Sequence, residues 1–150
     1  MEEALKKKRL LWRTVIQLGV ALVAIHIVAV ISRWYHTYPW IDIPQHFFGG
    51  VLAALIFYLI TYAYPRFFKL NSNFPIPIIL VVGWVALLGV LFELMEFSYD
   101  SIIFGYLGIG NFPSQLGLRD TIGDLFFDLI GGMSLAIFMR LRYDKRKRQL

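Results

Sequence analysis

Four long apolar stretches constrain the fold of this 150-residue chain more than any other feature. Residues 14–32, 47–65 and 70–92 carry no Asp, Glu, Lys or Arg, and residues 121–139 carry only two acids. A helix needs about 20 residues of this kind to cross a bilayer. Because lipid offers no partners to backbone N–H and C=O groups, each stretch is expected to be helical. The sequence therefore predicts an all-α integral membrane bundle of four antiparallel transmembrane helices.

The basic residues predict the orientation of this bundle. Arg33 and Arg119 fall on one side of the predicted membrane. The other thirteen of the fifteen Lys and Arg fall on the opposite side: Lys6, Lys7, Lys8, Arg9, Arg13, Arg66, Lys69, Arg140, Arg142, Lys145, Arg146, Lys147 and Arg148. The positive-inside rule makes that side cytoplasmic, so the termini at residues 1–13 and 140–150 are expected there, with residues 14–139 in the plasma membrane. The basic ends are expected to contact anionic lipids rather than nucleic acid.

The first apolar stretch has one competing interpretation, which is a cleaved signal peptide. Residues 1–13 resemble a basic n-region, but the nineteen uncharged residues that follow exceed a usual hydrophobic region, and no A-x-A-like site precedes Arg33. A retained span is therefore expected. The composition is 58% hydrophobic with a mean hydropathy of +0.62, which fits a membrane protein without a second domain.

The fourth span must contain ionisable groups. Only eleven residues separate Asp128 from Arg140, which is too short to cross a bilayer. The span must therefore begin near Thr121 and include both Asp124 and Asp128. Acids at this depth are costly, and they usually mark an ion path, a proton relay or a reactive site.

The topology brings this pair of acids close to others. The second span starts, the third ends and the fourth starts on the extracytoplasmic side, so their polar residues should share one layer. Within each segment the spacing of i, i+3 or i, i+4 places the groups on one helix face. The candidate metal ligands in this layer are Asp42, His46, Glu93, Glu96, Asp120, Asp124 and Asp128.

Carboxylates this close cannot all remain ionised without compensation, so either some hold protons or a cation neutralises them. An oxygen-rich site with one imidazole favours Mg²⁺, Mn²⁺ or Ca²⁺ over Zn²⁺ or Fe. The absence of cysteine excludes thiolate ligands. His46 and Glu93 are the candidates for moving a proton. Arg119 is the candidate for binding a phosphate or carboxylate group.

Several of these residues also have structural interpretations, which the sequence leaves open. Asp42 and Asp120 could cap their helices, and Glu96 could simply lie at the membrane interface. Asp100 fits a solvated loop acid. His26, alone in the first span, fits a hydrogen-bond donor between packed helices.

Small residues predict where the helices approach most closely. Gly49, Gly50, Gly131 and Gly132 are expected at such contacts, because a residue without Cβ lets two backbones meet in lipid.

The segment from residue 97 to residue 118 is predicted to be an outward-facing loop, yet it is rich in large apolar side chains and glycine. A loop of this composition is expected to lie at the membrane interface or over the bundle. An apolar cover over an anionic pocket fits an amphipathic ligand such as a lipid with a phosphorylated headgroup. Packing for stability alone remains an equal alternative.

The polar residues together resemble the motif of VanZ-like membrane proteins. The match consists of Asp42-x-x-x-His46-Phe47, then Glu93, then Arg119-x-x-x-x-Asp124-x-x-x-Asp128-x-x-Gly131. The chain departs from that pattern at Ile43, where Lys is usual, and at Asp128, where Asn is usual. With this acidic fourth helix it more closely resembles uncharacterised small prokaryotic four-span membrane proteins that share the same skeleton. The resemblance covers the second to fourth spans and implies a role in the cell envelope without implying a reaction.

Two classes of function follow from these residues. One is a metal-dependent hydrolase or transferase that acts on, or binds, a phosphorylated lipid or polyprenyl phosphate. The other is a non-enzymatic protein that conducts a cation or proton, or binds lipid. Conduction would need either oligomerisation or a polar continuation below Asp128, where Ser134 is nearly the only candidate. A serine hydrolase is disfavoured because Ser98, Ser101 and Ser114 lack a G-x-S-x-G turn. The oligomeric state is left open.

Overall fold

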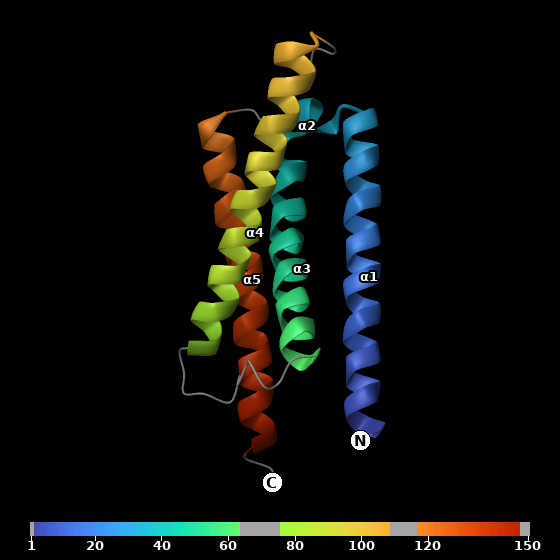
Figure 1. The fold of residues 1–150 in the computed structure, drawn as a ribbon, viewed down its shortest axis with the longest axis vertical. Coiled ribbons are helices and arrows are strands. Elements are labelled where there is room, and N and C mark those ends of the chain that lie inside the picture. The colour runs from blue at the N-terminus through green and yellow to red at the C-terminus, as the bar shows by residue number, and fades with distance from the viewer. Residues whose placement is uncertain (1, 64–75, 109–116, 148–150) are drawn as a thin grey trace.

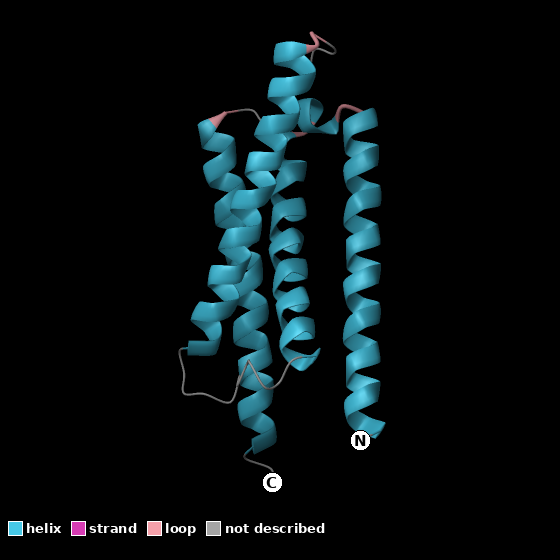
Figure 2. Ribbon diagram, viewed as in Figure 1, coloured by secondary structure: helices cyan, strands magenta, loops and turns pink. Residues whose placement is uncertain are grey.

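The computed structural model describes residues 2–63, 76–108 and 117–147 as a bundle of four long helices (Figure 1). These are α1 (Glu2–Ile31), α3 (Asp42–Ala63), α4 (Ile76–Asp100) and α5 (Leu118–Lys147). The described residues contain no strand (Figure 2).

Each of the four helices is long and apolar enough to cross a membrane, over Lys8–Ile31, Pro39–Thr61, Ile76–Ile103 and Leu118–Arg142. The prediction of an all-α bundle with four spans is therefore confirmed. The described chain starts and ends at the same end of the bundle (Figure 1). The assignment of that end to the cytoplasm remains a prediction from the distribution of basic residues.

Helix α3 occupies the centre of the bundle and contacts α1, α4 and α5. A short turn made of α2 (Trp34–Thr37) and η1 (Pro39–Ile41) connects α1 to α3. Helix α1 packs against α3 and is otherwise peripheral, because only 6% of the apolar stretch within its span is buried in the bundle. Its exposed Val and Ile side chains suit contact with lipid chains.

Glycines set the close approach of α3, α4 and α5. A Cβ atom on Gly50 would collide with the backbone carbonyl oxygen of Asp128, and one on Gly131 would collide with that of Phe47. A Cβ atom on Gly132 would lie 2.6 Å from a methyl group of Val85. The predicted close contacts at these glycines are confirmed, and α3 and α5 pack backbone to backbone as a result.

An apolar core fills the bundle on the side of the termini, two turns below the acids. It consists of Ala53, Ala54, Phe57, Val81, Val85 and Ala136. The indole Nε1 of Trp84 donates a hydrogen bond of 3.1 Å to the carbonyl oxygen of Ala53, which ties α4 to α3 at this level. The contact between α3, α4 and α5 is therefore apolar at this level.

The predicted start of the loop at residue 97 is wrong. Helix α4 continues to Asp100, and η2 (Ser101–Tyr106) prolongs it as a π-helical turn. The reason is that no glycine or proline interrupts the chain between Phe92 and Gly105, so the hydrogen-bonded ladder persists. It ends where Gly108 adopts a φ of +63°. The rest of the predicted loop, residues 109–116, and the start of the predicted third span, residues 70–75, lie outside the described residues.

Candidate metal centre

The first turns of α3 present Asp42 and His46 on one face. These residues are four apart, so their side chains project from the same side of the helix. The Nε2 atom of His46 lies 3.5 Å from Oδ1 of Asp42. His46 is only 8% exposed, whereas Asp42 lies nearer the surface of the bundle with 23% of its side chain exposed.

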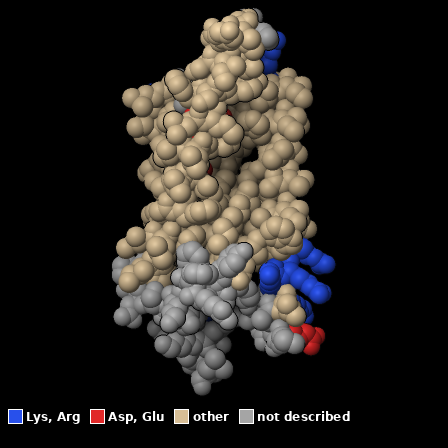
Figure 3. Space-filling view, viewed as in Figure 1, with Lys and Arg blue, Asp and Glu red and all other residues tan. Residues whose placement is uncertain are grey.

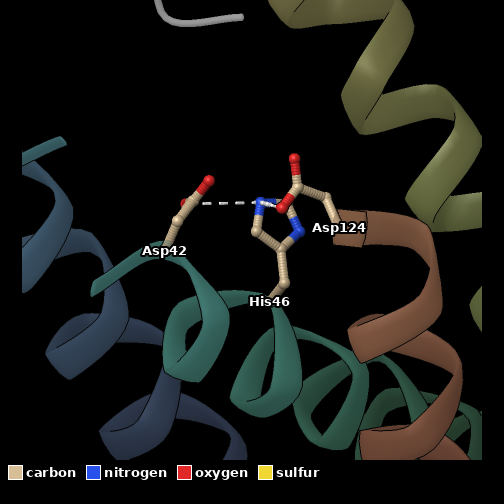
Figure 4. Close-up of side chains that lie close together, drawn as sticks. All are labelled: Asp42, His46 and Asp124. Atoms are coloured by element: carbon tan, nitrogen blue, oxygen red, sulfur yellow. Dashed lines mark ion pairs between the residues drawn. The ribbon is translucent and has the colours of Figure 1, made fainter. Parts of the chain in front are cut away.

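Helix α5 brings a second carboxylate to the same nitrogen. Oδ1 of Asp124 lies 3.7 Å from Nε2 of His46, and its side chain is as buried as the imidazole. Figure 4 shows Asp42 and Asp124 pointing toward the His46 ring from two different helices. One ligand atom from each of the three residues lies within 4.8 Å of the others, so the group could hold a metal ion.

Asp128 faces the other nitrogen of the same imidazole. Its Oδ2 atom lies 3.5 Å from Nδ1 of His46, with 11% of the Asp128 side chain exposed. Glycines leave room for this carboxylate, because Cβ atoms built on Gly49 and Gly89 would lie 3.3 and 2.9 Å from its oxygens. His46 is therefore held between a carboxylate at Nδ1 and two carboxylates at Nε2.

This arrangement matches a recurrent pattern in metal sites. A histidine that binds a metal through one ring nitrogen usually donates the N–H of the other to a carboxylate, which fixes the tautomer and the orientation of the ring. Two ligands that each lie about 2.0–2.5 Å from one ion are about 3–4 Å apart. The separations of 3.5 and 3.7 Å from Nε2 to Asp42 and Asp124 agree with that spacing.

The other predicted site residues occupy the surroundings of this group. Glu96 lines a large cavity beside Asp42, His46 and Asp128, whereas Glu93 is buried and lines a second cavity between α4 and α5. Asp120 lies in the first turn of α5, outside the three-residue group. Arg119 is exposed.

Two of the acids, Asp42 and Asp120, lie at helix N-termini and so can also stabilise their helices. Asp42 lies in the first turn of α3 and Asp120 in the first turn of α5. An acid at a helix N-terminus interacts favourably with the helix dipole, so a stabilising role accompanies either position.

A polar connection between α1 and α3 was not predicted from the sequence. The Tyr35 hydroxyl oxygen lies 2.7 Å from Nδ1 of His26, and the same hydroxyl donates a hydrogen bond of 3.0 Å to Oε1 of Gln45. Burial raises the pKa of Tyr35 well above its usual value. His26 was expected to form hydrogen bonds between helices, but no spacing pattern links three residues that come from α1, the connecting turn and α3.

A cavity of about 800 Å³ opens beside the three-residue group, between α1, α3 and α4. Figure 3 shows a hollow in an almost uncharged face of the bundle, with only small patches of acidic atoms visible between the side chains. His46, Asp124 and Asp128 are therefore buried in the bundle, whereas Asp42 is partly exposed.

Comparison with known proteins agrees with the membrane fold. The family described as "Predicted membrane protein (DUF2238)" matches residues 4–145, which is nearly the whole chain. The chain belongs to this family. An uncharacterized protein of Thermotoga maritima is 28% identical over 124 residues, which cover 83% of this chain and 60% of that protein. The chain thus spans about three fifths of the length of this relative. No solved structure matches.

The family match supports a membrane protein and extends over all four spans. The resemblance to VanZ-like proteins, which rests on the motif residues of the second to fourth spans, remains a prediction.

Proposed function

We propose that this protein binds a divalent cation through Asp42, His46 and Asp124 and, through that cation, the phosphate of a membrane lipid on the extracytoplasmic side. The observation that carries the proposal is the two-sided environment of His46. Its Nε2 atom faces Asp42 and Asp124, while its Nδ1 atom faces Asp128.

The burial of the acids favours a site with a bound cation over a site of ionised carboxylates without one. Counted as whole residues, Asp124 and Asp128 are 6% and 7% exposed. A buried ionised carboxylate is costly unless it is paired or coordinates a metal. A single imidazolium could offset only one of the three negative charges that surround it. A divalent ion held by Asp42, Asp124 and a neutral His46 would offset two of these charges, and Nδ1–H of His46 could donate a hydrogen bond to the third carboxylate, Asp128. The oxygen ligands favour Mg²⁺, Mn²⁺ or Ca²⁺.

A phosphate is the ligand that such an ion would attract. Three protein ligands leave coordination positions open, and Mg²⁺ in particular is often shared between carboxylates and a phosphate. Without the ion, Asp42, Asp124 and Glu96 would repel an anionic headgroup. The proposed binding of a phosphorylated lipid therefore depends on the metal.

The same group could support phosphoryl transfer, because a bound divalent ion polarises a phosphoryl oxygen. In that case His46 would act as a ligand, since both of its ring nitrogens face carboxylates. Glu96 lines the same cavity as the metal group and is therefore better located than Glu93 to accept or donate a proton.

Conduction of ions or protons receives less support from the described helices. Two turns below Asp128, Ala136, Val85 and Ala53 form an apolar layer between α3, α4 and α5. Ala53 and Val85 also line the apolar part of the cavity. Ser134, the polar residue considered for a continuation of the path, is exposed on the outer surface of α5. A path through this monomer would have to cross an apolar layer in which these three residues offer no charged or polar side chain.

Binding of Mn²⁺ to the purified protein in detergent tests the proposal. We expect Mn²⁺ electron paramagnetic resonance titrations to show one site in the wild type and to show affinity lowered at least about tenfold in Asp124→Asn. Asp120→Asn is the matched control, because it removes an acid from the same helix one turn outside the group. Equal affinity in all three proteins would reject the metal centre.

A further inference from the structure

The cavity beside the metal group is divided into a polar end and an apolar end. Asp42, His46, Asp128 and Glu96 contribute to its wall at the end away from the termini. Toward the middle of the bundle the wall consists of side chains such as Leu22, Leu52, Ile56 and Val85. Ile56 follows His46 by ten positions on α3, so the cavity extends for about 15 Å along the helix from its polar end to its apolar end.

The peripheral position of α1 makes this cavity accessible from the bilayer. Helix α1 forms one wall, yet it packs on α3 and leaves most of its apolar surface exposed. Ile27, which lines the cavity, is itself 50% exposed. At Gly19 the two helices are in contact, since a Cβ atom there would lie 3.7 Å from Leu52. The cavity is therefore a groove between α1 and α4 with α3 as its floor.

We propose that this groove binds one hydrocarbon chain of a phosphorylated membrane lipid, which reaches it laterally from the bilayer and places its phosphate at the metal group. The phosphate end of this inference rests on the proposed function, whereas the chain-binding groove is an independent feature with its own test.

The shape and chemistry of the groove fit such a ligand. Its volume of about 800 Å³ is typical of a small-molecule site, which spans about 300–1,000 Å³. The apolar wall would exclude a free phosphate or a soluble phosphate ester from most of this volume. An uncharged lipid would fill the apolar part but would leave the carboxylates and the metal without a partner. A lipid phosphate matches both ends at once.

The test measures lipid retention by native mass spectrometry after incubation with dioleoyl phosphatidic acid or with dioleoylglycerol, which has the same chains and no phosphate, in Mn²⁺ or in EDTA. We expect wild type to retain phosphatidic acid in preference to dioleoylglycerol, and to lose this preference in EDTA. Leu22→Trp and Ile27→Trp, which place an indole in the groove, should each lower retention of phosphatidic acid about tenfold. Val20→Trp is the control on the same helix, because Val20 is 65% exposed and does not line the groove.

The possible results separate the two proposals. If Leu22→Trp and Ile27→Trp lose the lipid but still bind Mn²⁺, the groove and the metal centre are both supported, and they are separate sites. Unchanged retention in both groove variants overturns the groove, even if Mn²⁺ binds normally. Selective retention of phosphatidic acid that survives EDTA overturns the link between phosphate and metal and indicates that the protein recognises this headgroup directly. Equal retention of both lipids overturns the inference, because it would reflect nonspecific lipid contact.

Discussion

The Nδ1 atom of His46 lies 3.5 Å from Oδ2 of Asp128, at the place where α3 and α5 approach each other most closely. The contact joins residues 82 positions apart in the sequence. It exists because Gly49 and Gly50 leave space for the Asp128 side chain and backbone against α3. Helix packing and imidazole orientation are therefore determined at the same point.

Asp128→Asn should weaken metal binding without abolishing it. An amide oxygen can still accept a hydrogen bond from Nδ1, but without a full negative charge, so the basicity of Nε2 falls. We expect Mn²⁺ affinity to fall by about 10- to 100-fold, as for other residues that orient a metal ligand. Asp124→Asn should lose more. A titration in which Asp128→Asn binds more weakly than Asp124→Asn would reverse the roles assigned to these two acids.

Metal binding should stabilise the wild type more than Asp124→Asn, because the variant binds the ion at least about tenfold more weakly. Without metal, Asp124→Asn should unfold at the same temperature as wild type or at a higher one, because removal of one carboxylate relieves repulsion among its neighbours. With Mn²⁺ at a hundred times its Kd, the wild type should gain about 2.7 kcal/mol. Melting curves of both proteins with and without Mn²⁺ measure this difference. Lower stability of the metal-free variant would indicate a structural role for Asp124 instead.

Gly50→Ala should destabilise the bundle strongly. Its new methyl group would meet the backbone carbonyl of Asp128, which cannot move without separating α3 from α5. We expect a loss of at least about 1–3 kcal/mol, measured by unfolding in detergent. Gly83→Ala is the matched control, since nothing lies within 4 Å of a Cβ atom at that position. A helical alanine there should be neutral or stabilising by up to about 1 kcal/mol. Equal effects at the two sites would contradict the close approach of α3 and α5.

Tyr35→Phe should make the protein less sensitive to alkaline pH. The pKa of Tyr35 is raised in the folded protein, chiefly by burial, so its neutral form is favoured there. This stabilisation is present below the pKa of tyrosine in the unfolded chain, near about 10, and is lost as the pH rises from there toward the folded value. Melting temperatures between pH 8 and 11 should therefore fall more steeply in wild type than in the variant.

At neutral pH, Tyr35→Phe should also lose the hydrogen bonds to His26 and Gln45, at a cost of about 1 kcal/mol. His36→Phe serves as a control because His36 is exposed in the same connecting turn. Parallel pH profiles for wild type and Tyr35→Phe would show that Tyr35 remains ionisable as in solvent.

The orientation can be tested with single cysteines, because the chain contains none. Tyr106 is 86% exposed at the end of the bundle that carries the site, and Leu5 is 50% exposed at the end that carries the termini. In intact cells, a membrane-impermeant maleimide should label Tyr106→Cys directly. It should label Leu5→Cys only after permeabilisation, and the opposite pattern would invert the topology.

The number of spans, the shared side of the acids and the closely packed glycines could all be predicted from the sequence. These properties depend on the length of an uncharged run, on charge counts at its ends and on residue size, and each can be read along a single segment. The predicted loop from residue 97 could not be located in the same way, because membrane span length does not dictate where a helix stops.

The composition of the site depended on tertiary structure. Glu93 and Glu96 were expected on one face, but three residues rotate a helix by about 300°, which leaves the two side chains about 60° apart. That difference is enough for Glu93 to line the cavity toward α5 and Glu96 to line the groove toward α1. Backbone contacts at glycine determine how α3, α4 and α5 rotate and cross. This packing places Asp42 and Asp124 at one nitrogen of His46 and Asp128 at the other, which no single segment of the sequence specifies.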